Sequence, residues 1–173
     1  MTQAWVTPVR LHALGKGVLT IRLEPDAAER AKVAKDLGLV SLPALTASLT
    51  LKPWMDGVEI TGRFEAVVEQ ICAVSLDNFE TPLSGVIELR AVPAGSPQAP
   101  EPNGGEVDYD PEAPDPPDVL EGDALDLAGY VVEHLALEID PFARKPGVAF
   151  DYTPEPEPES PFAVLRKLKG DTP

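Results

Sequence analysis

The sequence predicts an α+β fold in which one antiparallel sheet packs against about three helices. The first half of the 173-residue chain is dominated by alternating apolar and polar residues, which are typical of half-buried antiparallel strands. Two amphipathic stretches with capping residues, and a short third one near the C-terminus, indicate helices. A chain of this length buries enough surface for one core, so we expect one domain over residues 1–173.

The N-terminal segment predicts two strands and a helix. Two short strands are expected between Trp5 and Leu23, joined as a hairpin at Gly15–Gly17. The helix should begin after Asp26, where Glu29 completes a capping box, and end at Gly38. Its apolar side is mainly alanine, which suits a helix lying on a sheet.

Strands are expected to follow over Leu42–Lys52, Val58–Leu76 and Thr81–Val92, with a turn at Pro53–Gly57 between the first two. In the second strand the even-numbered residues from Ile60 to Leu76 share one face. The run is too long for one flat strand, so a bend or bulge is expected at Gly62 or near Gln70. The strand order, and with it closure of the sheet into a barrel, is left open.

Charge is distributed unevenly along the chain. The net charge is −15, and residues 91–143 carry 13 acidic and no basic side chains. Within this stretch, residues 94–118 are rich in proline, glycine and acid, which predicts a disordered acidic loop. A shorter Pro/Glu run at 153–160 predicts an extended linker.

Two further helices are expected after the acidic loop. The first starts at Asp123–Asp126, repeats apolar residues at helical spacing, and is stopped by Pro141. The second occupies the C-terminus, where Ser160 is a suitable N-cap, Pro161 fits the first turn and Gly170 can end the helix.

The sequence offers little catalytic or metal-binding chemistry. Cys72 is the only cysteine, and a nucleophilic thiol needs a base, for which only His12 and His134 exist. One cysteine and two separated histidines do not form a structural zinc site without carboxylates. Nucleotide-binding and hydrolase motifs are absent. We therefore expect no catalytic residues, no metal and no cofactor, with Cys72 as a small buried strand residue and a Cys–His pair as the less favoured alternative.

No segment approaches about 18 consecutive apolar residues, and the start of the chain lacks a basic stretch leading into an apolar run. A cytoplasmic protein without membrane contact is expected on these grounds. The oligomeric state is not predicted.

The order of several motifs carries a family resemblance. A V-x-x-T-G-R-F-E-A segment at 58–66 leads into Cys72, and after the acidic loop come L-D-L-A at 125–128, L-A-L-E-I-D-P at 135–141 and a terminal S-P-F-A-V-L. From about Val9 to Lys169 the chain resembles the YceD family, the large-subunit ribosomal RNA accumulation proteins of bacteria and plastids, in particular its alphaproteobacterial branch. Many relatives read C-x-R-C-L-E-P-F at residues 72–79, where this chain has Val74 and Ser75 in place of the arginine and the second cysteine. A metal role of the cysteine pair is therefore not carried over.

The resemblance implies a non-catalytic factor for accumulation of 23S rRNA in large-subunit biogenesis. It implies structural roles for Cys72, Leu76 and Phe79, the last two packing the hairpin onto the core. The implied partners are 23S rRNA or its precursor, or large-subunit assembly proteins. Among the cationic residues that could touch RNA or a partner, we favour Arg144, Lys145, Arg166, Lys167 and Lys169 over Lys16, Arg22, Arg63 and Arg90. The alternative is an acidic protein-interaction module that reaches the ribosome through a partner without touching RNA. An enzyme that uses Cys72 is the third, least favoured hypothesis.

Overall fold

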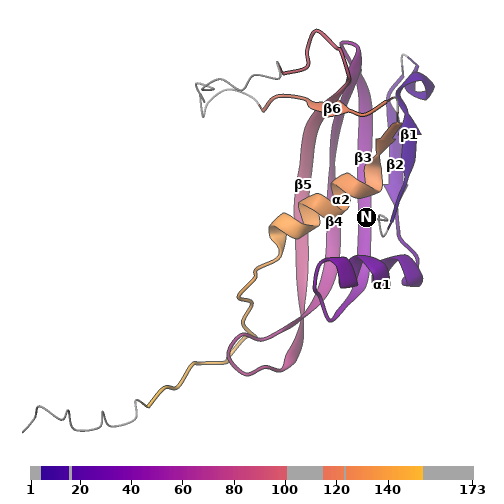
Figure 1. Ribbon diagram of the computed structural model, residues 1–173. Coiled ribbons are helices and arrows are strands. Elements are labelled where there is room, and N and C mark those ends of the chain that lie inside the picture. The colour runs from indigo at the N-terminus through magenta and orange to yellow at the C-terminus, as the bar shows by residue number, and fades with distance from the viewer. Residues whose placement is uncertain (1–4, 16, 101–114, 123, 154–173) are drawn as a thin grey trace, which may run out of the picture.

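The computed structural model describes residues 5–15, 17–100, 115–122 and 124–153 (Figure 1). The strands are β1 (Pro8–Arg10), β2 (Leu19–Leu23), β3 (Ser41–Trp54), β4 (Gly57–Ile71), β5 (Asn78–Pro93), β6 (Asp118–Leu120) and β7 (Ala124–Asp126). The helices are a 3₁₀ turn, η1 (Leu11–Leu14), and two α-helices, α1 (Ala27–Asp36) and α2 (Leu127–Glu138). The predicted α+β class is confirmed. The predicted C-terminal helix, the Pro/Glu linker after Thr153 and residues 101–114 of the predicted acidic loop lie outside the described residues. Both ends of that loop are described, and there the expectation of disorder is wrong, because the Ser96 hydroxyl donates to the Asp56 carboxylate at 2.8 Å and Asp118 begins β6.

The main sheet has five strands in the order β2-β3-β4-β5-β6. All neighbours are antiparallel except β6, which runs parallel to the end of β5. A separate two-stranded sheet joins β1 to β7. The expectation of a single, wholly antiparallel sheet is therefore wrong in these two details. Within the described residues β2 and β6 are the two edges of an open sheet, which is not a closed barrel.

The predicted N-terminal hairpin does not form. Val9 in β1 pairs with Leu125 in β7, whereas Leu19 in β2 pairs with Leu51 in β3. Between the two strands, η1 carries the chain from one sheet to the other. Gly15 follows it with a φ of 55°, which glycine adopts without steric cost. Pairing with distant strands has overridden the local turn signal, because β1 is too short to hold a hairpin by itself.

The three long strands agree with the predicted alternation, and the expected turn joins β3 to β4. At Gly62, the first place where an irregularity was expected, the ladder is regular. A register shift between Ser41 and Ala44 of β3 lies opposite Val67–Glu69. It is therefore close to Gln70, the second expected place, but the extra residue belongs to β3 and not to β4. Gly62 serves close strand approach, because a Cβ on it would lie 2.2 Å from the carbonyl oxygen of Ser48.

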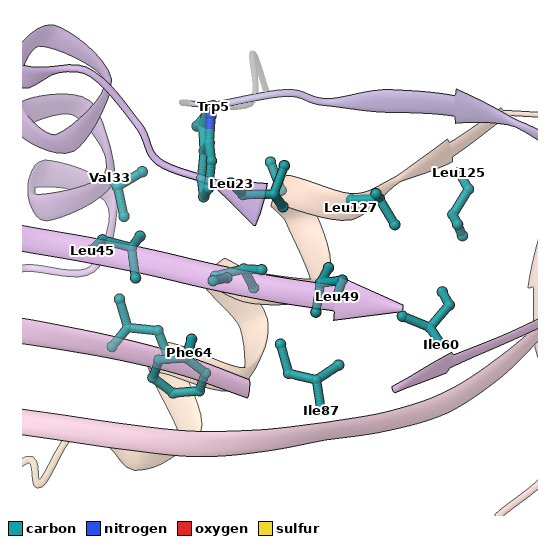
Figure 2. Close-up of a cluster of buried hydrophobic side chains, with 14 of the residues drawn as sticks. Trp5, Leu23, Val33, Leu45, Leu49, Ile60, Phe64, Ile87, Leu125 and Leu127 are labelled. Atoms are coloured by element: carbon teal, nitrogen blue, oxygen red, sulfur yellow. The ribbon is translucent and has the colours of Figure 1, made fainter. Parts of the chain in front are cut away.

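The core lies between one face of the main sheet and a layer formed by α1, α2 and the β1–β7 sheet (Figures 1 and 2). Figure 2 shows side chains from both layers meeting, among them Val33 of α1, Leu45 and Leu49 of β3, Ile60 and Phe64 of β4, Ile87 of β5 and Leu127 of α2. Because both helices cover the same face, the other face of the five-stranded sheet is left to solvent. Its residues are mostly polar or half-buried, and the exposed Val86 is an exception.

Both α-helices begin at residues that the sequence marks as caps. At α1 the Asp26 carboxylate accepts from the Glu29 N–H, and the Glu29 carboxylate accepts from the Asp26 N–H, each at 2.8 Å. At α2 the N-cap is Asp126, so the helix starts later than Asp123 because Ala124–Asp126 forms β7. Gly38 ends the first helix region with a φ of 68°, as predicted.

Asp126 joins the segment before β1 to the start of α2 and yields a stability prediction. Its Oδ1 accepts from the Thr7 N–H at 2.7 Å and from the Ala128 N–H at 3.2 Å, while Oδ2 is buried without a partner among the described residues. Asp126→Ala removes the cap and leaves the Thr7 donor unpaired, so we expect a loss of about 1–3 kcal/mol in urea unfolding. Asp126→Asn keeps the accepting oxygen and should cost less than half as much. Equal losses in the two variants would contradict the capping role.

Candidate functional site at the Cys72 turn

The connection between β4 and β5 is a compact turn over residues 72–77. The Cys72 N–H donates to the Asp77 carbonyl at 2.8 Å, and the Leu76 N–H donates to the Cys72 carbonyl at 3.0 Å. Leu76 adopts a φ of 62°, a left-handed conformation that is uncommon for a residue with a branched side chain. The turn therefore holds a strained residue at its tip.

The segment after α2, residues 140–145, is bound to this turn, and we call the two segments together the clasp. The Ala73 N–H donates to the Ala143 carbonyl at 2.9 Å, and the Lys145 ammonium lies 3.4 Å from the Asp77 carboxylate. Two residues before Cys72, the Gln70 side-chain amide donates to the Asp140 carbonyl at 2.9 Å. Residues that lie about 70 positions apart in sequence are thus joined by main-chain and side-chain hydrogen bonds.

Cys72 is the centre of the clasp. Its Sγ accepts from the backbone N–H groups of Val74, Ser75 and Lys145, each at 3.4 Å, and the residue is fully buried. Hydrogen bonds from the Ser75 side chain, and then from the backbone of Ser75, Lys145 and Val74, lower the pKa of the thiol from 9.0 to about 6, although burial acts in the opposite direction. The sulfur is therefore a structural acceptor that holds three donors from two chain segments.

The hydrogen bonds that the structure describes at the Cys72 sulfur come from backbone N–H groups. His134 lies in α2, where its Nδ1 is 2.8 Å from the Tyr130 carbonyl oxygen. Among the residues that the structure describes, no group of three or more His, Cys, Asp or Glu side chains could hold a metal ion. No described helix is long and apolar enough to cross a membrane.

The predicted site residues are partly brought together. Cys72 and Lys145 are in contact, and Arg144 is exposed beside them. Phe79 is half-buried at the start of β5, paired with Gln70. The expectation that Leu76 packs onto the core is wrong, because its side chain is 75% exposed. The left-handed backbone at Leu76 directs the chain away from the strand alternation on which that expectation was based.

Three of the remaining cations are described, and they lie away from this cluster. Arg166, Lys167, Lys169 and Lys16 lie outside the described residues. Arg22 and Arg63 lie on the open face of the main sheet, in register with Ser48 between them. Arg90 is held at 3.3 Å from Glu59 and lies over the Trp54 ring at 4.9 Å, so its charge is already engaged.

Sequence reasoning missed exposed apolar residues near the clasp. Ile71 and Leu76 flank Cys72, and Phe142 precedes the clasped Ala143 with its side chain 72% exposed. Farther along, Phe150 and Tyr152 are exposed and stack with ring centroids 6.0 Å apart. The sequence signal for them is a set of aromatic residues placed among prolines after Pro141, which stops the helix.

Comparisons with known proteins give one match. The family model described as large ribosomal RNA subunit accumulation protein YceD matches residues 60–169. This range includes most of β4, all of β5, the Cys72 turn and α2. No curated protein and no solved structure matches the chain.

Proposed function

Because the chain belongs to the YceD family of large ribosomal RNA subunit accumulation proteins, we propose that it is a non-catalytic factor for 23S rRNA accumulation in large-subunit biogenesis. The observation that carries the proposal is the family match over residues 60–169. The Cys72 turn lies inside this matched region and joins two parts of it that are distant in sequence.

The non-catalytic part of the proposal is supported by the state of Cys72. A nucleophilic thiol must be accessible to its substrate. The Cys72 sulfur is buried and accepts hydrogen bonds from backbone N–H groups of its own turn and of Lys145. A thiolate at this position stabilises the clasp and is not accessible to a substrate. We therefore propose that the protein acts by binding, with 23S rRNA precursors or large-subunit assembly proteins as partners.

Separation of ribosomal subunits by sedimentation tests this function. We expect cells depleted of the protein to lose large subunits relative to small subunits and to accumulate large-subunit precursors. Rescue with wild type, and with Cys72→Ser, should restore the balance, because serine keeps an acceptor in the clasp without a thiol. An unchanged subunit balance on depletion would overturn the proposed role. Failure of only the Cys72→Ser rescue, with that variant folded, would overturn its non-catalytic part.

RNA contact can be separated from protein-mediated docking by salt and by loop deletion. Phosphate contacts through Arg144 and its neighbours should weaken steeply as salt rises and should survive deletion of residues 96–117. Docking through the acidic stretch should be abolished by that deletion. The two outcomes can be compared by capturing the tagged protein from ribosome precursors.

A further inference from the structure

The β5 strand has an unpaired edge. On one side it pairs with β4 from Asn78 to Ala91, which is all of β5 except its last two residues. On the other side, β6 pairs only with Ala91–Pro93. Among the described residues, no strand lies beside the remaining stretch from Asn78 to Arg90, so its outward N–H and C=O groups have no ladder partner.

Pro82 indicates which backbone groups point outward. Successive residues of an antiparallel strand direct their hydrogen-bonding groups to opposite sides, and proline is tolerated where no ladder donor is needed. Pro82 therefore occupies a position that faces away from β4. By the same alternation Ser84, Val86 and Glu88 present their N–H and C=O groups at the free edge, and the Val86 side chain is 67% exposed. The edge is thus open to a further strand from Ser84 onward.

Helix α2 overhangs this edge. It packs on β5, and in Figure 1 it crosses the sheet face and ends beyond β5. Tyr130, Glu133 and His134 line a cavity of about 620 Å³ together with Glu88 and Leu89 of β5. Leu137 continues their helical stripe and is 82% exposed. The helix therefore offers a partly apolar surface above the free edge, beside which the described part of the chain places no strand.

The cavity at this edge is acidic. Its carboxylates are Glu59, Glu88, Asp115, Asp118 and Glu133. Of these five carboxylates, only that of Glu59 forms ion pairs with described residues, namely Arg90 and Lys52. Arg90 is the one permanently charged cation in the lining, and it is already matched by Glu59. The unmatched negative charge selects against a phosphate backbone and in favour of a cationic segment.

We propose that the β5 edge between Ser84 and Arg90 takes up an extended lysine- or arginine-rich segment of a partner protein as an added strand under α2. Main-chain hydrogen bonds to β5 supply the pairing, and the carboxylates around Glu88 and Glu133 supply the preference for basic side chains. A second copy of this chain fits poorly, because its β5 edge would bring the same acidic residues into the groove. The identity of the partner as an assembling large-subunit protein rests on the proposed function; the binding surface does not.

Peptide binding to the full chain tests the proposal. The probe is a peptide of about seven alternating lysine and valine residues. The control is a peptide of the same length in which glutamate replaces lysine. We expect the basic peptide to bind at low ionic strength and to shift the backbone amide resonances of Ser84–Arg90. The acidic control peptide should bind at least tenfold more weakly than the basic peptide.

Two sets of variants separate edge pairing from general electrostatic attraction. Val86→Pro removes an outward N–H without touching the β4 ladder and should weaken binding of the basic peptide about tenfold. Val86→Thr keeps the N–H and the branched side chain and should bind within about twofold of wild type. The double variant Glu88→Lys, Glu133→Lys keeps the edge and should also weaken binding about tenfold.

Equal affinity of Val86→Pro and Val86→Thr, both folded by circular dichroism, would overturn strand addition. Equal binding of the two peptides would overturn the basic preference. A wild-type dimer that dissociates on Val86→Pro would show that a second copy is the occupant and would overturn the proposed partner. These experiments use the purified protein. The proposed binding surface can therefore be disproved while the subunit balance in depleted cells still supports the proposed function, and the reverse can also hold.

Discussion

Replacing Phe64 with alanine is expected to lower the free energy of unfolding by about 3–5 kcal/mol, which urea unfolding followed by circular dichroism would measure. Phe64 is a fully buried side chain of the central strand β4. Its cross-strand neighbour is Gly85 in β5, and a Cβ on that glycine would lie 2.5 Å from the Phe64 ring. The ring therefore fills the space that the glycine leaves, and truncation would open a cavity at the centre of the sheet.

Phe64→Leu is the matched control for this prediction. Leucine keeps most of the buried apolar volume, so its loss should be well under half that of Phe64→Ala. The exposed Val86, replaced by alanine, should cost only a few tenths of a kcal/mol. A loss below about 1 kcal/mol for Phe64→Ala would show that the ring does not hold β4 and β5 together as described.

Replacing Cys72 with alanine is expected to remove a pH dependence of stability. The three N–H donors and the Ser75 side chain hold the pKa of the folded thiol at about 6, below its ordinary value of 9.0. A depressed folded pKa stabilises the fold fully above the unfolded pKa, and that contribution is lost as pH falls through the folded pKa. The free energy of unfolding of the wild type should therefore rise between about pH 6 and pH 9 relative to Cys72→Ala.

Urea titrations at several pH values in this window would measure the difference. Cys72→Ser serves as a second reference, because its hydroxyl can accept from the same donors but does not titrate there. We expect the serine variant to be more stable than the alanine variant and to share its flatter pH profile. Parallel profiles for wild type and Cys72→Ala would contradict the assignment of Cys72 as an anionic acceptor in the clasp.

Local signals in the sequence predicted the parts of the fold that are set by local physics. Neighbouring residues determine both the capping box of Asp26 and Glu29 and the alternation along β4. Both features are present as expected. The pairing of β1 with β7 and of β6 with β5 joins segments far apart in the chain, for which composition carries no signal. Asp126 illustrates the difference: its role as a cap is readable, but its bond to Thr7 depends on tertiary structure.

The candidate site was predictable only in part for the same reason. Cys72 stands out as the sole cysteine, and its burial was expected. The donors that define its chemistry are backbone N–H groups, one of them from Lys145, and a main-chain donor has no sequence signature. Leu76 was misplaced because strand alternation was extended into a turn whose left-handed φ interrupts it. The free edge of β5 became visible only once the strand order was known.

The steady-state ratio of 23S to 16S rRNA in cells depleted of this protein tests the central claim most directly. Membership of the YceD family and the binding role proposed here predict a selective fall in 23S rRNA, reversed when wild type is restored. An unchanged ratio, with depletion verified, would contradict a role of this chain in 23S rRNA accumulation.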